Sequence, residues 1–304
     1  MKTALSRLEA RRGWLSPALA LVVLSATPVA AEVRSSSFES PSLGQQVSYV
    51  VDLPASYDGS SERYPVVYTL HGLFEGAGFW ERRGLARELS RLRSSGAVPD
   101  FIVVAVDGGN SFFVNAPGGR YEDLVTKDLI AHVESTYRVE RGPRHRTLLG
   151  ISMGGYAALR IAFTHPGLFA AVATHSAMLL ESPPSAAQGA RRGHMRAFHG
   201  VFGDPIDEAL WTGNDPLFLA RSADASSSPR LYLDCGAQDR YGLPRGHRIL
   251  VRVLEERGVP HTFTLPPGDH GYDFVRGRLA TSLPFLMRGQ VENRESGPGN
   301  VLSR

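Results

Sequence analysis

Short, continuous apolar runs recur along this chain and constrain its fold more than any other feature. Most of the runs end at Gly, Pro or Asp. Because the apolar residues are continuous and do not alternate with polar ones, the runs suit strands buried on both faces of a parallel sheet. The runs lie at residues 47–53, 65–70, 101–106, 147–149, 170–173, 231–233 and 261–265.

Helical segments alternate with these runs, at residues 124–137, 156–163 and 248–257. In the last segment the apolar residues fall on one helical face, and Gly258 and Pro260 follow as a stop signal. Alternating strands and helices predict an α/β fold. Its central sheet should be mostly parallel, with right-handed crossovers and helices on both faces.

The stretch 181–230 interrupts this rhythm. It is rich in Pro, Ser, Gly and Arg, and we expect an insertion over the C-terminal edge of the sheet. Asp215 followed by Pro216 predicts a helix start within it, because a capping side chain precedes Pro at the first helical position. Loops above this edge usually shape the ligand pocket.

The first 31 residues have the pattern of an export signal. Basic residues precede an apolar stretch at 14–24, and small residues at 29–31 offer a cleavage site before Glu32. We expect a signal peptide, since the apolar stretch is too short to favour a membrane span. The alternatives are a lipid-resident anchor and a frayed N-terminus. Arg11 and Arg12 loosely resemble a twin-arginine signal.

We therefore expect a domain at residues 32–289 that is periplasmic or secreted. After removal of the leader, no stable membrane insertion is expected. Residues 290–304 lack apolar periodicity and are expected to form a loose tail. The leader carries a net charge of +3, as does the whole chain, so the remainder is formally neutral. A neutral remainder gives no reason to expect a nucleic-acid partner. Cys235 is the one cysteine, so no intramolecular disulfide can form, and a buried thiol is expected.

A Gly-x-Ser-x-Gly string surrounds Ser152, between the run 147–149 and the next helical segment. Strand, string and helix together are the setting of a nucleophile elbow, whereas the string alone recurs by chance. Gly150 and Gly154 meet the steric demand of that strained turn. The helix start after Ser152 adds positive potential where negative charge develops. Ser152 is therefore the predicted nucleophile.

The predicted base is His270, which follows the last apolar run and a Pro-Pro-Gly turn. In α/β-hydrolases the chain order is Ser, acid, His, with the His after the last strand. Asp239 is the predicted acid because it lies on the loop after the preceding strand. Asp234 is the fallback, still on that strand. Asp269 directly adjoins His270, and neighbouring side chains seldom meet well.

Two backbone N–H groups are expected to form an oxyanion hole, those of Met153 and Leu73. Met153 directly follows the nucleophile, and Leu73 lies on the loop after the run 65–70. Further residues are expected to line a substrate pocket. The candidate pocket residues are His71, Phe112, Phe113, Tyr121 and His175. For Phe112 and Phe113, an ordered loop with buried rings is an equal alternative.

The sequence offers no pattern for a metal or another cofactor. It contains no His-Glu-x-x-His string, no paired cysteines and no Gly-rich phosphate loop after the first strand. We therefore expect catalysis by side chains and backbone alone.

Several strings in this chain together resemble the putative esterase family of α/β-hydrolases. They lie at residues 70–72, 150–156, 234–239 and 268–270, and the resemblance runs from 47 to 288. That family includes esterase D, feruloyl and acetylxylan esterases, enterochelin esterases and the antigen 85 mycolyltransferases. The resemblance implies an α/β-hydrolase fold with a catalytic triad made of Ser152, Asp239 and His270. Tyr272 departs from the family, since many members carry Trp two residues after the His.

The sequence thus predicts an exported serine carboxylic ester hydrolase that works through an acyl-enzyme on Ser152. The expected substrate is a small-molecule, carbohydrate or siderophore ester. An acyltransferase that passes the acyl group to an alcohol is the alternative, because its first steps are identical. A non-catalytic carbohydrate or siderophore binder is a third possibility. The oligomeric state stays open.

Overall fold

The computed structural model describes residues 32–185 and 192–290. The expected signal peptide, at 1–31, lies outside the described residues, as does 291–304 of the expected tail. Gln290, the first tail residue, is buried, and its side chain contacts His145 Nδ1 at 3.0 Å. Gln290, which the sequence placed in the expected tail, therefore packs against the domain.

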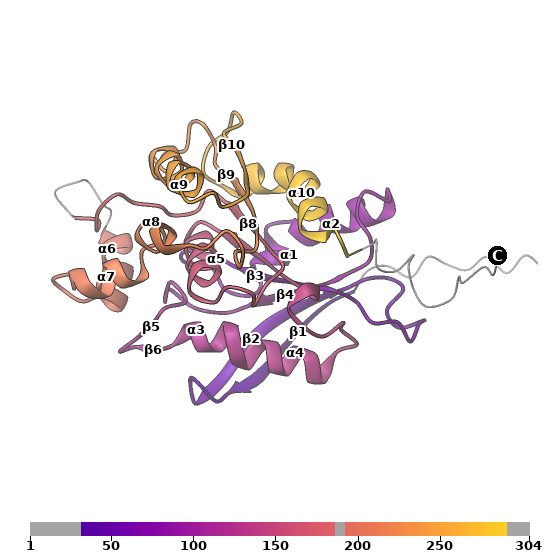
Figure 1. The fold of residues 1–304 in the computed structure, drawn as a ribbon. Helices are drawn as coiled ribbons and strands as arrows, with labels where there is room; N and C mark the ends of the chain where they lie inside the picture. Colours follow the sequence, from indigo (N-terminus) through magenta and orange to yellow (C-terminus); the bar gives the residue numbers. More distant parts are fainter. Residues whose placement is uncertain (1–31, 186–191, 291–304) are drawn as a thin grey trace, which may run out of the picture.

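An eight-stranded sheet forms the centre of the described part of the chain, in the order β1-β2-β4-β3-β7-β8-β9-β10 (Figure 1). From β4 to β10 all neighbours are parallel, whereas β2 runs antiparallel to both β1 and β4. The prediction of a mostly parallel sheet is confirmed. The strands are β1 Glu32–Ser40, β2 Gln45–Leu53, β3 Val66–Leu70, β4 Ile102–Val106, β7 Arg146–Ile151, β8 Ala171–His175, β9 Arg230–Asp234 and β10 His261–Thr264.

Helices cover both faces of this sheet. Successive strand residues point to opposite faces, so Val103 and Leu149 pack with α2 and α10, while Val104 and Leu148 pack with α4, α5 and α9. This two-sided burial explains why the runs contain no polar alternation. The helices are α1 Phe79–Arg82, α2 Leu85–Ser94, α3 Tyr121–Asp123, α4 Ile130–Thr136, α5 Met153–Thr164, α9 Pro244–Glu256 and α10 Tyr272–Met287.

Some elements differ from the sequence prediction. The helix expected at 124–137 begins at Tyr121 and includes a π-helical stretch, η1 Leu124–Leu129. A small two-stranded ribbon, β5 Asn115–Ala116 and β6 Gly119–Arg120, precedes it. The edge strand β1 was not predicted, because its sequence is polar and Ser-rich and its outer edge has no partner strand in the sheet.

The insertion forms short helices, α6 Arg192–Phe202, α7 Glu208–Asn214 and α8 Pro216–Leu219. The predicted helix start is confirmed, since Asp215 Oδ1 accepts the N–H of Leu217 at 3.0 Å and Pro216 opens α8. Figure 1 shows α6 and α7 at one end of the molecule. Within residues 32–185 and 192–290, no helix is long and apolar enough to cross a membrane.

Candidate active site

Ser152 occupies a sharp turn between β7 and α5, with φ 55° and ψ −113°. A non-Gly residue with positive φ is strained and requires support from its surroundings. A Cβ on Gly150 would lie 2.1 Å from the carbonyl oxygen of Gly154, and a Cβ on Gly154 would lie 2.1 Å from that of Leu70. Both positions therefore accept only glycine, for the steric reason that the sequence suggested.

The structure brings Ser152, His270 and Asp239 into one hydrogen-bonded chain. Ser152 Oγ lies 3.1 Å from His270 Nε2, and His270 Nδ1 lies 2.8 Å from Asp239 Oδ2. Since a carboxylate only accepts, Nδ1–H donates to Asp239 and leaves Nε2 free to accept the Ser152 hydroxyl proton. This is the geometry that a general base needs next to a nucleophile.

Asp239 is enclosed within the turn that follows β9. Its side chain is fully buried, and Oδ1 accepts the N–H of Tyr241 at 3.0 Å. Burial by itself raises the pKa of Asp239, but the hydrogen bond and charge of His270 outweigh it and hold that pKa below its usual range. Asp239 therefore stays ionised at neutral pH and can hold the imidazole in one tautomer.

Asp234, the fallback acid, belongs to a separate buried network. Its Oδ1 lies 2.8 Å from His175 Nδ1, while its Oδ2 accepts from Tyr232 Oη at 2.9 Å and Arg278 Nε at 3.0 Å. His175 Nε2 contacts Ser282 Oγ on α10 at 3.0 Å. The expectation that His175 lines the pocket is wrong, because its ring is fully buried and both ring nitrogens contact residues of this network.

The loop after β3 lies beside the nucleophile. A Cβ on Gly72 would be 3.5 Å from Ser152 Cβ, and Leu73 lines the cleft in front of Ser152. Met153 is the first residue of α5, so its N–H has no partner earlier in the helix. The two expected oxyanion residues thus lie on either side of Ser152, Leu73 on the loop after β3 and Met153 at the start of α5.

His71 is buried beneath the loop after β3 and does not line the pocket, contrary to expectation. It is fully buried, Nδ1–H donates to the carbonyl of Gly72 at 2.8 Å, and Nε2 accepts the N–H of Gly108 at 3.0 Å. The ring therefore ties the loop after β3 to the loop after β4. Its buried position leaves no surface for substrate.

Phe112 and Phe113 are also fully buried, with φ 55° and 50°. Phe112 packs on Phe198 of the insertion, with ring centroids 4.8 Å apart, and on Tyr156 of α5 at 5.7 Å. The pocket role expected for the Phe pair is wrong, and the alternative of an ordered loop with buried rings holds. Tyr121 lines a separate cavity of about 280 Å³.

The cleft at Ser152 has a volume of about 670 Å³. Aromatic side chains that the sequence analysis missed line it. Phe74 is 57% exposed and Tyr241 is 44% exposed, and the Tyr241 ring lies 4.8 Å from that of His270. His194 stands between them, 5.5 Å from Phe74 and 5.6 Å from Tyr241. We call Phe74, His194 and Tyr241 the aromatic wall. Phe74 could have been noticed because it directly follows the expected oxyanion residue.

The described ranges contain no group of three or more His, Cys, Asp or Glu side chains that could hold a metal ion. Cys235 is buried, and its Sγ lies 3.6 Å from Asp239 Oδ2. Burial, reinforced by the Asp239 charge, raises the pKa of this thiol, so Cys235 stays protonated.

The chain is similar in sequence to known esterases. The chain is 26% identical to an esterase of Mycobacterium tuberculosis over 77% of its own length and 54% of the relative, so it spans about half of that protein. It is 24% identical to an acetyl esterase of Caldicellulosiruptor saccharolyticus over 76% of this chain and 86% of the relative.

Solved structures share the fold. A ferulic acid esterase superposes with a TM-score of 0.71 at 26% identity, covering 86% of this chain and 98% of that one. A fluorophosphonate-binding serine hydrolase of Staphylococcus aureus superposes with a TM-score of 0.70 at 21% identity, covering 85% and 99%. The family model described as "Putative esterase" matches residues 40–285. With its α/β-hydrolase fold, this chain belongs to that esterase family.

Proposed function

We propose that this protein is a serine carboxylic ester hydrolase. The observation that carries the proposal is the hydrogen-bonded chain from Ser152 Oγ through His270 to the buried Asp239. His270 removes the hydroxyl proton as Ser152 attacks the acyl carbonyl. The N–H groups of Met153 and Leu73 stabilise the oxyanion, a contribution on the order of 3 kcal/mol each.

His270 gives its proton to the alcohol oxygen as the bond between the acyl carbon and that oxygen breaks, which leaves the acyl group on Ser152. Water then attacks the Ser152 ester while His270 accepts its proton. That proton returns to Ser152 Oγ as the free acid leaves. Family membership and the esterase names of the relatives support this outcome. The test is hydrolysis of short p-nitrophenyl esters by wild type and Ser152→Ala. Equal activity of the two proteins would rule out the assignment.

Acyl transfer to an alcohol is the second candidate. It shares every step up to the acyl-enzyme, and the cleft of about 670 Å³ leaves room for an acceptor next to His270. A mixed assay with ester and an added alcohol distinguishes the two reactions. A new ester formed in proportion to the alcohol supports transfer, whereas free acid alone supports hydrolysis.

The aromatic wall supports esters with a flat ring, either an aromatic acyl group or a sugar. Exposed rings of this kind bind planar or sugar surfaces through large apolar contacts. A panel of acetyl, feruloyl and siderophore esters tests this choice through kcat/KM. Similar kcat/KM values for all esters of the panel would contradict a preference for aromatic groups.

The proposed location is the periplasm or the exterior, from the signal-like pattern at residues 1–31. Cell fractionation with intact-mass analysis tests it. A cytosolic protein that retains residues 1–31 would contradict export.

A further inference from the structure

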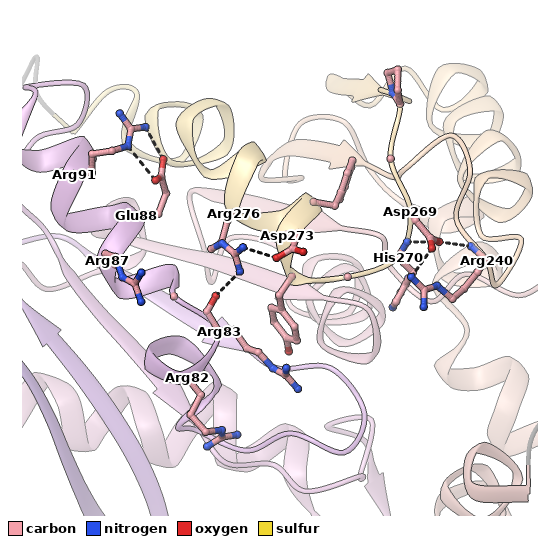
Figure 2. Close-up of a pocket in the computed structure, with 16 residues that line it drawn as sticks. Arg82, Arg83, Arg87, Glu88, Arg91, Arg240, Asp269, His270, Asp273 and Arg276 are labelled. Atoms are coloured by element: carbon pink, nitrogen blue, oxygen red, sulfur yellow. Dashed lines mark hydrogen bonds and ion pairs between the residues drawn. The ribbon is translucent and has the colours of Figure 1, made fainter.

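We propose that an arginine-rich groove beside His270 binds an anionic group on the alcohol part of the ester substrate. The inference rests on the proposed esterase function. The groove has a volume of about 1110 Å³ and carries three acidic side chains, Glu88, Asp269 and Asp273 (Figure 2). Its cationic lining, here called the arginine groove, consists of Arg82, Arg83, Arg87, Arg91, Arg240 and Arg276.

Elements far apart in sequence build this charge. Arg87 and Arg91 lie one turn apart on α2, Arg276 comes from α10, and Arg240 directly follows the catalytic acid. Figure 2 shows Arg87 on the α2 side and Arg240 on the His270 side, with Arg276 between them. Because residues 32–304 are formally neutral, an excess of arginine here is a local concentration of positive charge.

Five of these guanidinium groups pair with carboxylates. Arg82 and Arg83 share the largely buried Glu75, and Arg91 contacts the partly buried Glu88 at 2.6 Å. Arg276 and Arg240 pair with the exposed Asp273 and Asp269. Exposed pairs contribute only about 0–1 kcal/mol, so a substrate anion can replace Asp273 or Asp269 at little cost.

Arg87 is the unpaired cation of the groove. Among the described residues it makes no hydrogen bond or ion pair, and its side chain is exposed. A guanidinium presents donors that match the oxygens of a carboxylate, sulfate or phosphate. Arg87 therefore offers a direct site for an incoming anion.

The arginine groove continues directly from the catalytic cleft. Both cavities are lined by Arg83, Arg240, His270, Gly271 and Tyr272. Since His270 must protonate the leaving alcohol, the alcohol oxygen has to lie within hydrogen-bond distance of Nε2. The rest of the alcohol then extends past His270, which places its substituents in the groove. The acyl part occupies the cleft that the aromatic wall lines.

The test uses two acetate esters that differ only in the charge of the leaving group, 3-carboxy-4-nitrophenyl acetate and 3-carbamoyl-4-nitrophenyl acetate. The ratio of their kcat/KM values is compared between proteins, so the intrinsic reactivity of the esters cancels. Arg87→Glu should lower the anionic-to-neutral ratio about fivefold, and added salt should lower the wild-type ratio. Arg252→Glu, a charge reversal on α9 outside the groove, is the matched control and should keep the wild-type ratio.

An unchanged ratio in Arg87→Glu would overturn the proposal. So would an Arg87-dependent preference for the anionic acyl group of 4-nitrophenyl hemisuccinate without any for the anionic alcohol. Calorimetric binding of 5-hydroxy-2-nitrobenzoate, the anionic product, to Ser152→Ala separates this proposal from the proposed function. The same measurement is made on the double variant Ser152→Ala/Arg87→Glu. Weaker binding to the double variant supports the groove even if neither ester is hydrolysed, whereas equal binding to the single and double variants refutes it.

Discussion

The backbone N–H of Ser152 donates to the carbonyl oxygen of His175 at 3.0 Å. The side chain of the same histidine contacts Asp234 on β9 and Ser282 on α10. The strand end beneath the nucleophile is therefore fixed by a buried network that is separate from the chain of Ser152, His270 and Asp239. We therefore assign different tasks to the two aspartates near β9: stability to Asp234 and, in the proposed mechanism, catalysis to Asp239.

Asp234→Asn should lower the free energy of unfolding by about 3–5 kcal/mol, because Arg278 and His175 lose a buried carboxylate. The folded fraction should retain most of its kcat. Urea denaturation measures the free energy of unfolding. Steady-state rates divided by the active-site concentration, titrated with a fluorophosphonate, give kcat. A variant with wild-type stability and abolished kcat would contradict the structural role.

Asp239→Asn should lower kcat by about 10³–10⁴, since an amide no longer favours the His270 tautomer with a proton on Nδ1. Its Michaelis constant should change little. Steady-state kinetics on a short p-nitrophenyl ester measures both. A kcat within tenfold of wild type would show that Asp239 is not the acid.

Gly154→Ala should prevent formation of the elbow, because the added Cβ would lie 2.1 Å from the carbonyl oxygen of Leu70. Backbone atoms cannot yield as a flexible side chain would, so we expect a loss of soluble, folded protein. Gly213→Ala is the control. Gly213 is an exposed residue of helix α7 with open space around it, and alanine there should stabilise the helix by up to about 1 kcal/mol. Thermal unfolding compares the two, and wild-type stability of Gly154→Ala would contradict the steric argument.

Glu122 should make stability depend on acid pH. It pairs with the buried Arg160 of α5 at 2.8 Å and with His165. Burial opposes ionisation of Glu122, but the hydrogen bond with His165 and the charge of Arg160 outweigh it and lower the pKa of Glu122 from 4.5 to about 2. Because the folded pKa lies below the unfolded one, the stabilisation is complete above about pH 4.5 and is lost as the pH falls toward about 2.

Glu122→Gln should therefore be less stable by about 3–5 kcal/mol at pH 7, because Arg160 stays buried without its carboxylate. The difference from wild type should shrink between pH 4.5 and 2. Glu256→Gln, an exposed substitution on α9, is the control. Urea denaturation at several pH values measures the trend, and a difference that grows on acidification would reverse the assigned sign.

Phe74→Ala should lower kcat/KM for a feruloyl ester about tenfold, as one exposed ring of the aromatic wall is lost. Hydrolysis of the corresponding acetyl ester should change by less than twofold. The two esters are assayed side by side. Equal losses on both would show that Phe74 acts on the loop of Leu73 and not on the acyl group.

The sheet and the sharp turn at Ser152 could be predicted from the sequence for a physical reason. Strands buried on both faces need continuous apolar residues, and the elbow needs glycines where any Cβ would strike backbone, so both leave marks in the sequence. The order of Ser152, Asp239 and His270 along the chain then follows from the order of the parallel strands.

The pocket lining was not accessible in the same way. His71 and Phe112 lie on loops and His175 ends strand β8, all at the expected edge of the sheet, yet all three side chains turn inward to make buried contacts. Which way a loop side chain points depends on tertiary partners such as Phe198, which come from a distant insertion. The arginine groove was missed for the same reason, because α2, α10 and the Asp239 loop meet only in the folded chain.

The most direct test of the account is intact-mass analysis of the protein after reaction with a fluorophosphonate, followed by peptide mapping. We predict one adduct per chain, located on Ser152, with none on Ser152→Ala and much slower labelling of His270→Ala. An adduct on another residue, or equal labelling of Ser152→Ala, would contradict the assignment of Ser152 as the nucleophile.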